Sequence, residues 1–282
     1  MTAGVAVVTG ASRGLGRGMA RALAQAGMTV YITGRDQGTV DQVAEECTRA
    51  GGKGIAVVCD HGNDEQTRAV FARVAEESGR LDLLVNNAAA VHVEDLSGSA
   101  PFWEKGLRLA EMIDVGLRSN YVATYHAAPL LIKTGGALVA HISFYGAVSY
   151  FHGPAYGAAK AGTDKLAYDM AHDFAPHDVA CVSLWPGFIR TEMIAGVPEE
   201  YLPPAMRASL PLFESPEFSG LVLERLWRDP ERMAFSGRTL IGAHLGERYG
   251  VRDLDGKQPR SFEERFGSPD NRFLVPDSEW PA

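Results

Sequence analysis

The chain has 282 residues, of which 46% are hydrophobic and 22% charged, and its formal net charge is −8. These values are typical of a soluble globular protein with one large or two small domains, and the negative charge argues against nucleic acid or an anionic membrane as the main partner. The first apolar run is too short for a signal peptide, and no window approaches a membrane span. The three cysteines, odd in number and set among apolar residues, indicate reduced thiols and a cytoplasmic location.

Short apolar segments alternate with helical patterns along the chain. The strand candidates, in order, are residues 4–10, 29–33, 54–60, 81–88, 136–143 and 179–187. Helical patterns between them include 13–27, 37–51 and 63–79, the last with Asn63 or Asp64 as its N-cap. Because strands without polar alternation are buried on both faces, we predict a Rossmann-like α/β fold, in which helices cover both faces of one doubly wound parallel sheet in a single domain.

The turn after the first strand, TGASRGLG, contains Gly10, Gly14 and Gly16. Glycine permits a tight turn and lets a ligand approach the backbone, and the free N–H groups of a helix start attract phosphate. A glycine-rich turn can be purely structural, but this one opens the first βαβ unit, where dinucleotide sites occur. We therefore predict a nucleotide site here.

The end of the second strand indicates which nucleotide binds. A cofactor with a free ribose 2′-hydroxyl calls for a carboxylate at this position, whereas a 2′-phosphate calls for cations. The sequence has Gly34 at this point, followed by Arg35, and Arg13 lies in the glycine turn. Two guanidinium groups suit a phosphate dianion, so we predict NADP(H). Asp36 keeps NAD(H) as the alternative.

Six short motifs carry a resemblance to a known family. They are TGASRGLG (9–16), CD (59–60), NNAA (86–89), Ser143, YGAAK (156–160) and PGFIRT (186–191). In this order, and at these strand ends, they resemble the compact short-chain dehydrogenase/reductases over about residues 4–250. The resemblance implies an oxidoreductase that interconverts carbonyl and alcohol groups by hydride transfer. It also implies a homo-oligomer, a dimer or tetramer formed through the helices of residues 104–134 and 154–175.

The resemblance also assigns cofactor contacts. It implies that Asp60 contacts the adenine, that Asn87 and Ala88 line the adenosine side, and that Ile189 and Thr191 contact the nicotinamide amide and the pyrophosphate. The full set predicted to bind the cofactor is Gly10, Ser12, Arg13, Gly14, Leu15, Gly16, Arg35, Asp60, Asn87, Ala88, Tyr156, Lys160, Pro186, Gly187, Ile189 and Thr191.

The predicted catalytic residues are Ser143, Tyr156 and Lys160. Tyr156 and Lys160 are four residues apart, so a helix places them on one face. A lone pair of this kind is typical of a surface helix, but here it follows a cofactor turn. A neighbouring ammonium and an oxidised nicotinamide ring favour the phenolate, so we expect the pKa of Tyr156 to fall from about 10 toward neutrality. Tyr156 then exchanges a proton with the substrate oxygen, and Ser143 donates a hydrogen bond to it.

One position departs from the family pattern. Many members have an asparagine, part of a proton relay, where this chain has Gly116, and Asn120 lies one helical turn further on. A non-catalytic nucleotide-sensing protein therefore stays an alternative. A sugar epimerase or dehydratase on the related longer fold is disfavoured by the glycine spacing and the chain length.

Aromatic and apolar residues surround the predicted catalytic group. A flap over about residues 188–214 follows the last strand candidate and is rich in proline and large apolar residues, which suits a bulky apolar ketone or aldehyde. The residues predicted to contact substrate are Phe144, Tyr145, His152, Phe188 and Met193. Packing in the core or at a subunit interface is the alternative role for each aromatic ring, and capping of the next helix is the alternative for His152. The histidines show no metal-ligand spacing, so no metal site is predicted.

The C-terminal residues differ in composition from the rest of the chain. We predict that residues 1–250 form the NADP(H)-binding catalytic domain and that residues 251–282 form an extension docked on it or on a neighbouring subunit. The observation behind this is four spaced large aromatic residues in a polar segment: Phe262, Phe266, Phe273 and Trp280.

Overall fold

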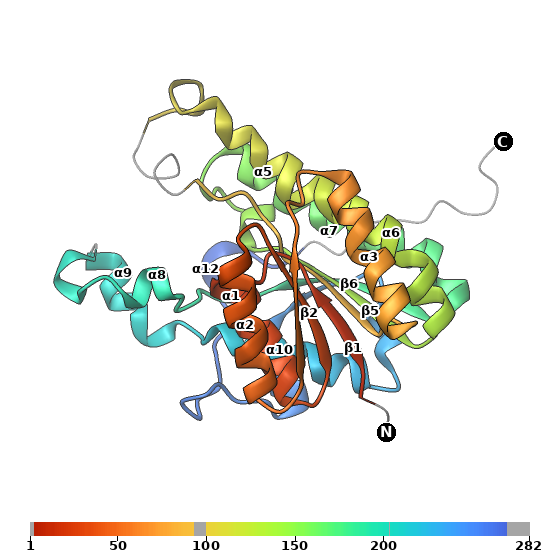
Figure 1. Cartoon of the computed structure of the whole chain (residues 1–282). Helices are drawn as coiled ribbons and strands as arrows, with labels where there is room; N and C mark the ends of the chain where they lie inside the picture. Colours follow the sequence, from red (N-terminus) through yellow and green to blue (C-terminus); the bar gives the residue numbers. More distant parts are fainter. Residues whose placement is uncertain (1–2, 93–99, 203, 270–282) are drawn as a thin grey trace.

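The computed structural model describes residues 3–92, 100–202 and 204–269. Its centre is a parallel sheet of seven strands in the order β3-β2-β1-β4-β5-β6-β7 (Figure 1). The strands are β1 Val5–Val8, β2 Thr29–Gly34, β3 Lys53–Val58, β4 Leu83–Asn86, β5 Ala137–Ile142, β6 Val179–Trp185 and β7 Thr239–Ile241. The first six confirm the predicted strands and the doubly wound topology, whereas β7 was not predicted, because three residues are too short to show a pattern.

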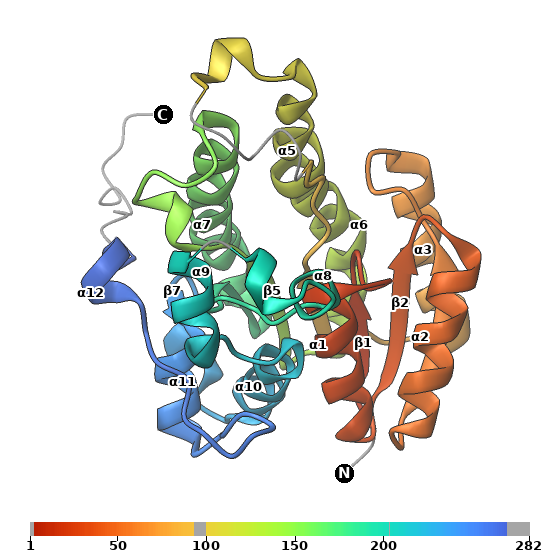
Figure 2. The same ribbon diagram turned by 90° about the vertical axis from the view of Figure 1, so that its left-hand side faces the viewer.

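Helices cover both faces of the sheet (Figures 1 and 2). The helices are α1 Gly14–Gln25, α2 Gln37–Arg49, α3 Asp64–Ser78, α5 Glu111–Ile113, α6 Ser119–Thr134, α7 Pro154–Phe174, α8 Glu192–Ala195, α9 Pro204–Ser209, α10 Pro216–Arg228, α11 Gly242–Tyr249 and α12 Glu263–Phe266. The predicted N-cap of α3 is confirmed at Asn63, whose side chain accepts a hydrogen bond from Gln66 N. No helix in the described ranges is long and apolar enough to cross a membrane.

The two faces of the sheet bury separate apolar clusters. Residues of α1, α2, α10 and α11 pack on one face, and residues of α3, α6 and α7 pack on the other. Successive strand residues alternate between the clusters, as Val5 and Val7 contribute to one and Ala6 and Val8 to the other. Both faces are therefore apolar, which explains why the strands read as continuous hydrophobic runs.

Two glycines permit close packing on the face of the sheet that is covered by α1, α2 and α10. A Cβ at Gly18 of α1 would lie 2.3 Å from the Cβ of Pro216, the first residue of α10. A Cβ at Gly54 of β3 would lie 2.1 Å from the carbonyl oxygen of Ala44 in α2. No side chain fits at these distances, so these contacts depend on glycine.

Candidate active site

The glycine turn after β1 is held against the end of β4. Gly10 has φ 62°, and a Cβ at Gly16 would lie 2.5 Å from the Nδ2 atom of Asn87. Asn87 Nδ2 donates hydrogen bonds to Thr9 O at 2.9 Å and to Gly10 O at 3.1 Å. Ala88 N donates to Thr9 Oγ1 at 3.0 Å. Asn87 and Ala88, directly after β4, thus hold the turn in place through hydrogen bonds to Thr9 and Gly10.

The other residues predicted to bind a cofactor lie on loops at the carboxyl edge of the sheet. They are Ser12, Gly14 and Leu15 at the start of α1, Arg35 after β2, Asp60 after β3, and Pro186, Gly187, Ile189 and Thr191 after β6. Asp60 is exposed, and its Oδ1 accepts a hydrogen bond of 2.9 Å from Gly62 N. The fold therefore gathers the predicted set along one edge, where ligands of doubly wound sheets bind.

The side chains of the two predicted phosphate-binding arginines have no partner within the described part of the chain. Arg13 and Arg35 are exposed, and their guanidinium groups make no hydrogen bond or ion pair with another described residue. Gly34 has no room for a carboxylate, because a Cβ there would lie 2.9 Å from the Cβ of Ser12. Asp36 caps α2, with its Oδ1 accepting a hydrogen bond of 2.8 Å from Thr39 N. Two guanidinium groups therefore lie exposed at this edge, and the carboxylate of Asp36 is engaged as a helix cap.

The three predicted catalytic residues come together where β5 ends beside α7. Ser143 directly follows β5 and is buried, and its Oγ donates a hydrogen bond of 3.0 Å to the carbonyl oxygen of Lys160. Lys160 Nζ donates to Ile142 O at 3.0 Å and lies 5.6 Å from the centroid of the Tyr156 ring. Pro154 at the first turn of α7 sets the start of the helix, so Tyr156 and Lys160 share a face as predicted.

The protein alone does not lower the pKa of Tyr156. Burial raises the pKa of its phenol, because the phenolate is the charged form and loses hydration in apolar surroundings. Burial also lowers the pKa of Lys160 to about 8, and the negative charge of Asp164 opposes this fall. The expectation that Lys160 and an oxidised nicotinamide ring together lower the pKa of Tyr156 concerns the cofactor-bound protein and stays a prediction.

Comparisons with known proteins show which family the chain belongs to. The family model for short chain dehydrogenases matches residues 4–202. The chain belongs to the short-chain dehydrogenase/reductase family. It is 41% identical over 271 residues to dehydrogenase/reductase SDR family member 1 of Homo sapiens, a match that covers 93% of this chain and 87% of that one. It is 32% identical over 186 residues, 64% of each chain, to a 3beta-hydroxysteroid dehydrogenase of Mediterraneibacter gnavus.

Solved structures of short-chain dehydrogenase/reductases share the fold of this chain. A short-chain dehydrogenase/reductase variant from Serratia marcescens superimposes with a TM-score of 0.72 and 25% identity, covering 84% of this chain and 95% of that one. Membership in the short-chain dehydrogenase/reductase family makes the chain an oxidoreductase of hydroxyl and carbonyl groups that uses a nicotinamide dinucleotide. The compact, single-domain Rossmann-like architecture is the one predicted from the sequence.

The aromatic residues after β5 have different surroundings. Phe144 and Phe188 are partly buried, with ring centroids 5.5 Å apart, and both touch Phe151. His152 is exposed, has φ 55° and places its ring 5.1 Å from that of Tyr156. It does not cap α7, because Gly153 occupies the N-cap position and no side chain caps this helix. Phe144, Phe188 and His152 thus lie around the Tyr156 side of the site.

Tyr145 and Met193 do not join them in the described structure. Tyr145 is fully buried, its ring lies 5.0 Å from that of Trp185, and its hydroxyl accepts a hydrogen bond of 2.9 Å from Phe262 N. The prediction that Tyr145 contacts the substrate is therefore corrected: its side chain is buried, and its ring packs against Phe144. The side chain of Met193 lies outside the described residues.

The departure at Gly116 is accompanied by a distorted helix. The chain kinks within residues Asp114–Arg118, where Val115 and Gly116 have non-helical backbone angles, and the φ of 154° at Gly116 favours glycine. Its carbonyl oxygen accepts hydrogen bonds from Asn120 Nδ2 at 2.8 Å and from Thr163 Oγ1 at 3.3 Å. The Asn120 side chain is thus directed at the kink of its own helix, and no described contact joins it to Tyr156 or Lys160.

Three acidic residues near the site were not identified from the sequence. Glu192 of α8 accepts hydrogen bonds at 3.0 Å from Gly14 N, at the start of α1, and at 3.0 Å from Arg17. Glu214 pairs with Phe188 through its backbone at the base of the predicted flap, and burial raises the pKa of its carboxyl to about 8. Asp164 is buried on α7. Of the three, only Asp164 could have been identified from the sequence, because it lies four residues after Lys160 and so on the same helix face.

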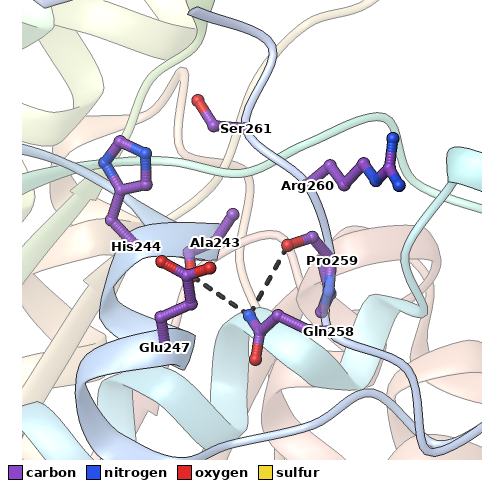
Figure 3. Close-up of a pocket in the computed structure, with 7 residues that line it drawn as sticks. All are labelled: Ala243, His244, Glu247, Gln258, Pro259, Arg260 and Ser261. Atoms are coloured by element: carbon purple, nitrogen blue, oxygen red, sulfur yellow. Dashed lines mark hydrogen bonds between the residues drawn. The ribbon is translucent and has the colours of Figure 1, made fainter.

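A separate cavity of about 420 Å³ lies beside α11 and the C-terminal extension (Figure 3). It is lined by Ala243, His244, Glu247, Gln258, Pro259, Arg260 and Ser261. Gln258 closes one side of it by donating to Ala243 O at 3.2 Å, and Arg260 points away from His244 and Glu247 (Figure 3). None of the predicted site residues lines this cavity, so it is distinct from the predicted cofactor edge.

Proposed function

We propose that this chain is an NADP(H)-dependent oxidoreductase that interconverts a bulky, mainly apolar ketone or aldehyde and its alcohol, with Ser143, Tyr156 and Lys160 as the catalytic residues. The observation that carries the choice of cofactor is the pair of exposed, unpartnered guanidinium groups of Arg13 and Arg35. Two further features agree with it. Gly34 leaves no space for the carboxylate that would bind a ribose hydroxyl, and Asp36 is engaged as a helix cap.

The catalytic residues divide the proton chemistry among them. When bound, the nicotinamide ring supplies or accepts the hydride. Tyr156 donates its phenolic proton to the substrate oxygen during reduction and removes a proton from the alcohol in the reverse direction. The Ser143 hydroxyl is freed from Lys160 O and donates a hydrogen bond to the same oxygen. The Lys160 ammonium stabilises the negative charge that develops on Tyr156.

The proposed substrate class follows from the lining of the site. Phe144, Phe151 and Phe188 form a contiguous aromatic wall with centroid separations between 5.3 and 6.2 Å. Such a wall binds apolar surface and leaves the hydroxyls of a sugar without partners. The names of the related hydroxysteroid dehydrogenases describe substrates of this bulky, apolar kind.

A steady-state assay tests the proposal. A panel of aromatic, alicyclic and steroidal ketones and aldehydes is assayed with NADPH and with NADH. We expect turnover with NADPH and a higher KM for NADPH in the Arg13→Ala and Arg35→Ala variants, with NADH affected less. Equal kcat/KM for the two dinucleotides would overturn the NADP(H) proposal.

Tyr156→Phe tests the catalytic assignment separately. We expect turnover to be lost while calorimetry still detects NADPH binding, because the phenyl ring keeps its packing and only the proton donor is removed. The matched control is Tyr168→Phe, the same change about three turns further along α7. Substantial turnover in Tyr156→Phe would refute the assignment, and NADPH binding without turnover of any substrate in the wild type would favour the nucleotide-sensing alternative.

We also propose a homo-oligomer that assembles through α6 and α7. Tyr121, Tyr125 and Ile132 on α6 are exposed, with the two tyrosine rings stacked 6.5 Å apart. Exposed apolar side chains on one helix are a common feature of subunit contacts. Light scattering of the wild type and of Tyr125→Glu measures the assembly, and an unchanged mass in the variant would exclude this surface.

A further inference from the structure

Asp164 occupies an unusual position for a carboxylate. It lies on α7 two turns after Tyr156 and one turn after Lys160, so the three side chains follow one face of the helix. Asp164 is only 7% exposed. Its carboxylate accepts hydrogen bonds from Ser183 Oγ at 2.6 Å and from Trp185 Nε1 at 3.1 Å. The Ser143 hydroxyl also lies close enough to lower the pKa of this carboxyl.

These hydrogen bonds do not account for the charge of Asp164. Ser183 and Trp185 are neutral donors, and an asparagine or an apolar pair would serve the packing as well. A buried charge is costly unless an opposite charge lies near. The positive charge of Lys160 lowers the pKa of Asp164. In turn, the negative charge of Asp164 raises the pKa of Lys160, and it is the one charge in the described part of the chain that does so.

The position of the two groups explains how one affects the other without direct contact. Lys160 Nζ donates to Ile142 O, and no hydrogen bond or ion pair joins it to Asp164. The groups that contact them are neutral: Ile142 at the end of β5, Ser143 directly after it, and Ser183 and Trp185 of β6. With little water between them, charges a helical turn apart interact more strongly than they would at the surface.

We propose that Asp164 is a positioning residue for the catalytic pair, whose negative charge keeps the Lys160 ammonium protonated beside Tyr156. This role rests on the proposed function. Burial lowers the pKa of Lys160 and so favours loss of its proton, and Gly116 supplies no side chain to the relay. The pKa of the Asp164 carboxyl is about 6 and that of Lys160 is about 8. Asp164 is therefore negatively charged over the pH range in which Lys160 loses its proton.

The test measures Lys160 directly. The chain has six lysines, so the protein labelled with 13Cε-lysine gives few signals, and Lys160→Met identifies the one of interest. We expect the Lys160 signal to titrate near pH 8 in the wild type and about one pH unit lower in Asp164→Asn. At pH 8 that shift reduces the protonated fraction, and with it turnover, by about fivefold, and it moves the alkaline limb of kcat/KM to lower pH.

Two matched controls separate charge from packing. Asp173→Asn makes the same change at an exposed position of α7 and should shift nothing. Ser183→Ala removes one hydrogen bond that lowers the pKa of Asp164 but keeps its carboxyl group, so it should lower the melting temperature and move the Lys160 midpoint less than Asp164→Asn does. An Asp164→Asn protein that is less stable but titrates like the wild type would overturn the proposal, because it would make Asp164 a structural residue.

The wild type alone gives a second test if Asp164→Asn does not fold. The Lys160 signal should show a smaller step near pH 6, where Asp164 gains its proton. Absence of this step would also overturn the proposal. The titration needs no substrate, so failure of the proposed function, seen as no turnover in the wild type, is distinguishable from failure of the role of Asp164.

Discussion

The C-terminal extension contributes a side chain to the core, and its removal should weaken both the fold and the substrate wall. Phe262 is 7% exposed, and its ring lies 4.9 Å from Phe188 and 6.2 Å from Tyr145. Truncating a buried phenylalanine costs about 3–5 kcal/mol. We expect about 3 kcal/mol for Phe262→Ala, at the low end, because neighbouring rings such as Phe188 and Phe266 are only partly buried and can relax toward the space.

Thermal unfolding at one fixed protein concentration measures this loss, since the melting temperature of an oligomer varies with concentration. A loss of 3 kcal/mol corresponds to a fall of about 5 °C in the melting temperature for a chain of this size. The KM for an apolar ketone should also rise, because Phe188 loses the ring that supports it. The matched control is Phe102→Ala, the same truncation at a ring that is 58% exposed, which should change stability by less than about 0.5 kcal/mol.

Tyr145→Phe isolates the polar part of the same contact. Its hydroxyl accepts from Phe262 N, so its removal leaves a buried N–H without an acceptor and should cost about 1–2 kcal/mol. A Phe262→Ala melting temperature equal to that of the Phe102→Ala control would refute the reasoning. The extension would then contribute nothing to the folded core, and the aromatic cluster would have to be stable without it.

Three further predictions concern other parts of the molecule. Glu192→Ala should tighten dinucleotide binding about two- to fivefold by calorimetry, because it frees Gly14 N and removes a negative charge beside the glycine turn; weaker binding would show that the carboxylate supports the site. Gly54→Ala should cost at least about 2 kcal/mol in urea unfolding, whereas Gly38→Ala, whose Cβ would meet only an atom 3.6 Å away, should not destabilise. Burial lowers the pKa of His61 to about 4, so the unfolded chain binds this proton first as the pH falls below about 6.5. The free energy of unfolding should therefore decrease by about 2 kcal/mol between neutral pH and pH 5. In His61→Asn this decrease should be smaller.

The local sequence was sufficient for most of the fold and for the composition of the site. Six apolar runs predicted six strands of a parallel sheet, because strands covered on both faces need no polar alternation. The spacing of Tyr156 and Lys160 predicted a shared helix face, and both residues lie on α7, which begins at Pro154. These features depend on residues within a few positions of one another, so the chain order alone reveals them.

Tertiary structure decided the features that depend on distant segments. It placed Tyr145 under Phe262, 117 residues away, and so turned a predicted substrate contact into a buried support. It also paired Asp164 with Ser183 and Trp185 of a strand that follows it in the chain, and it withdrew water from Tyr156, which raises the pKa of a phenol that sequence reasoning expected to be acidic. Burial and charge environment arise only when separate elements pack, and for that reason the chain order fixes which groups are present but not how they ionise.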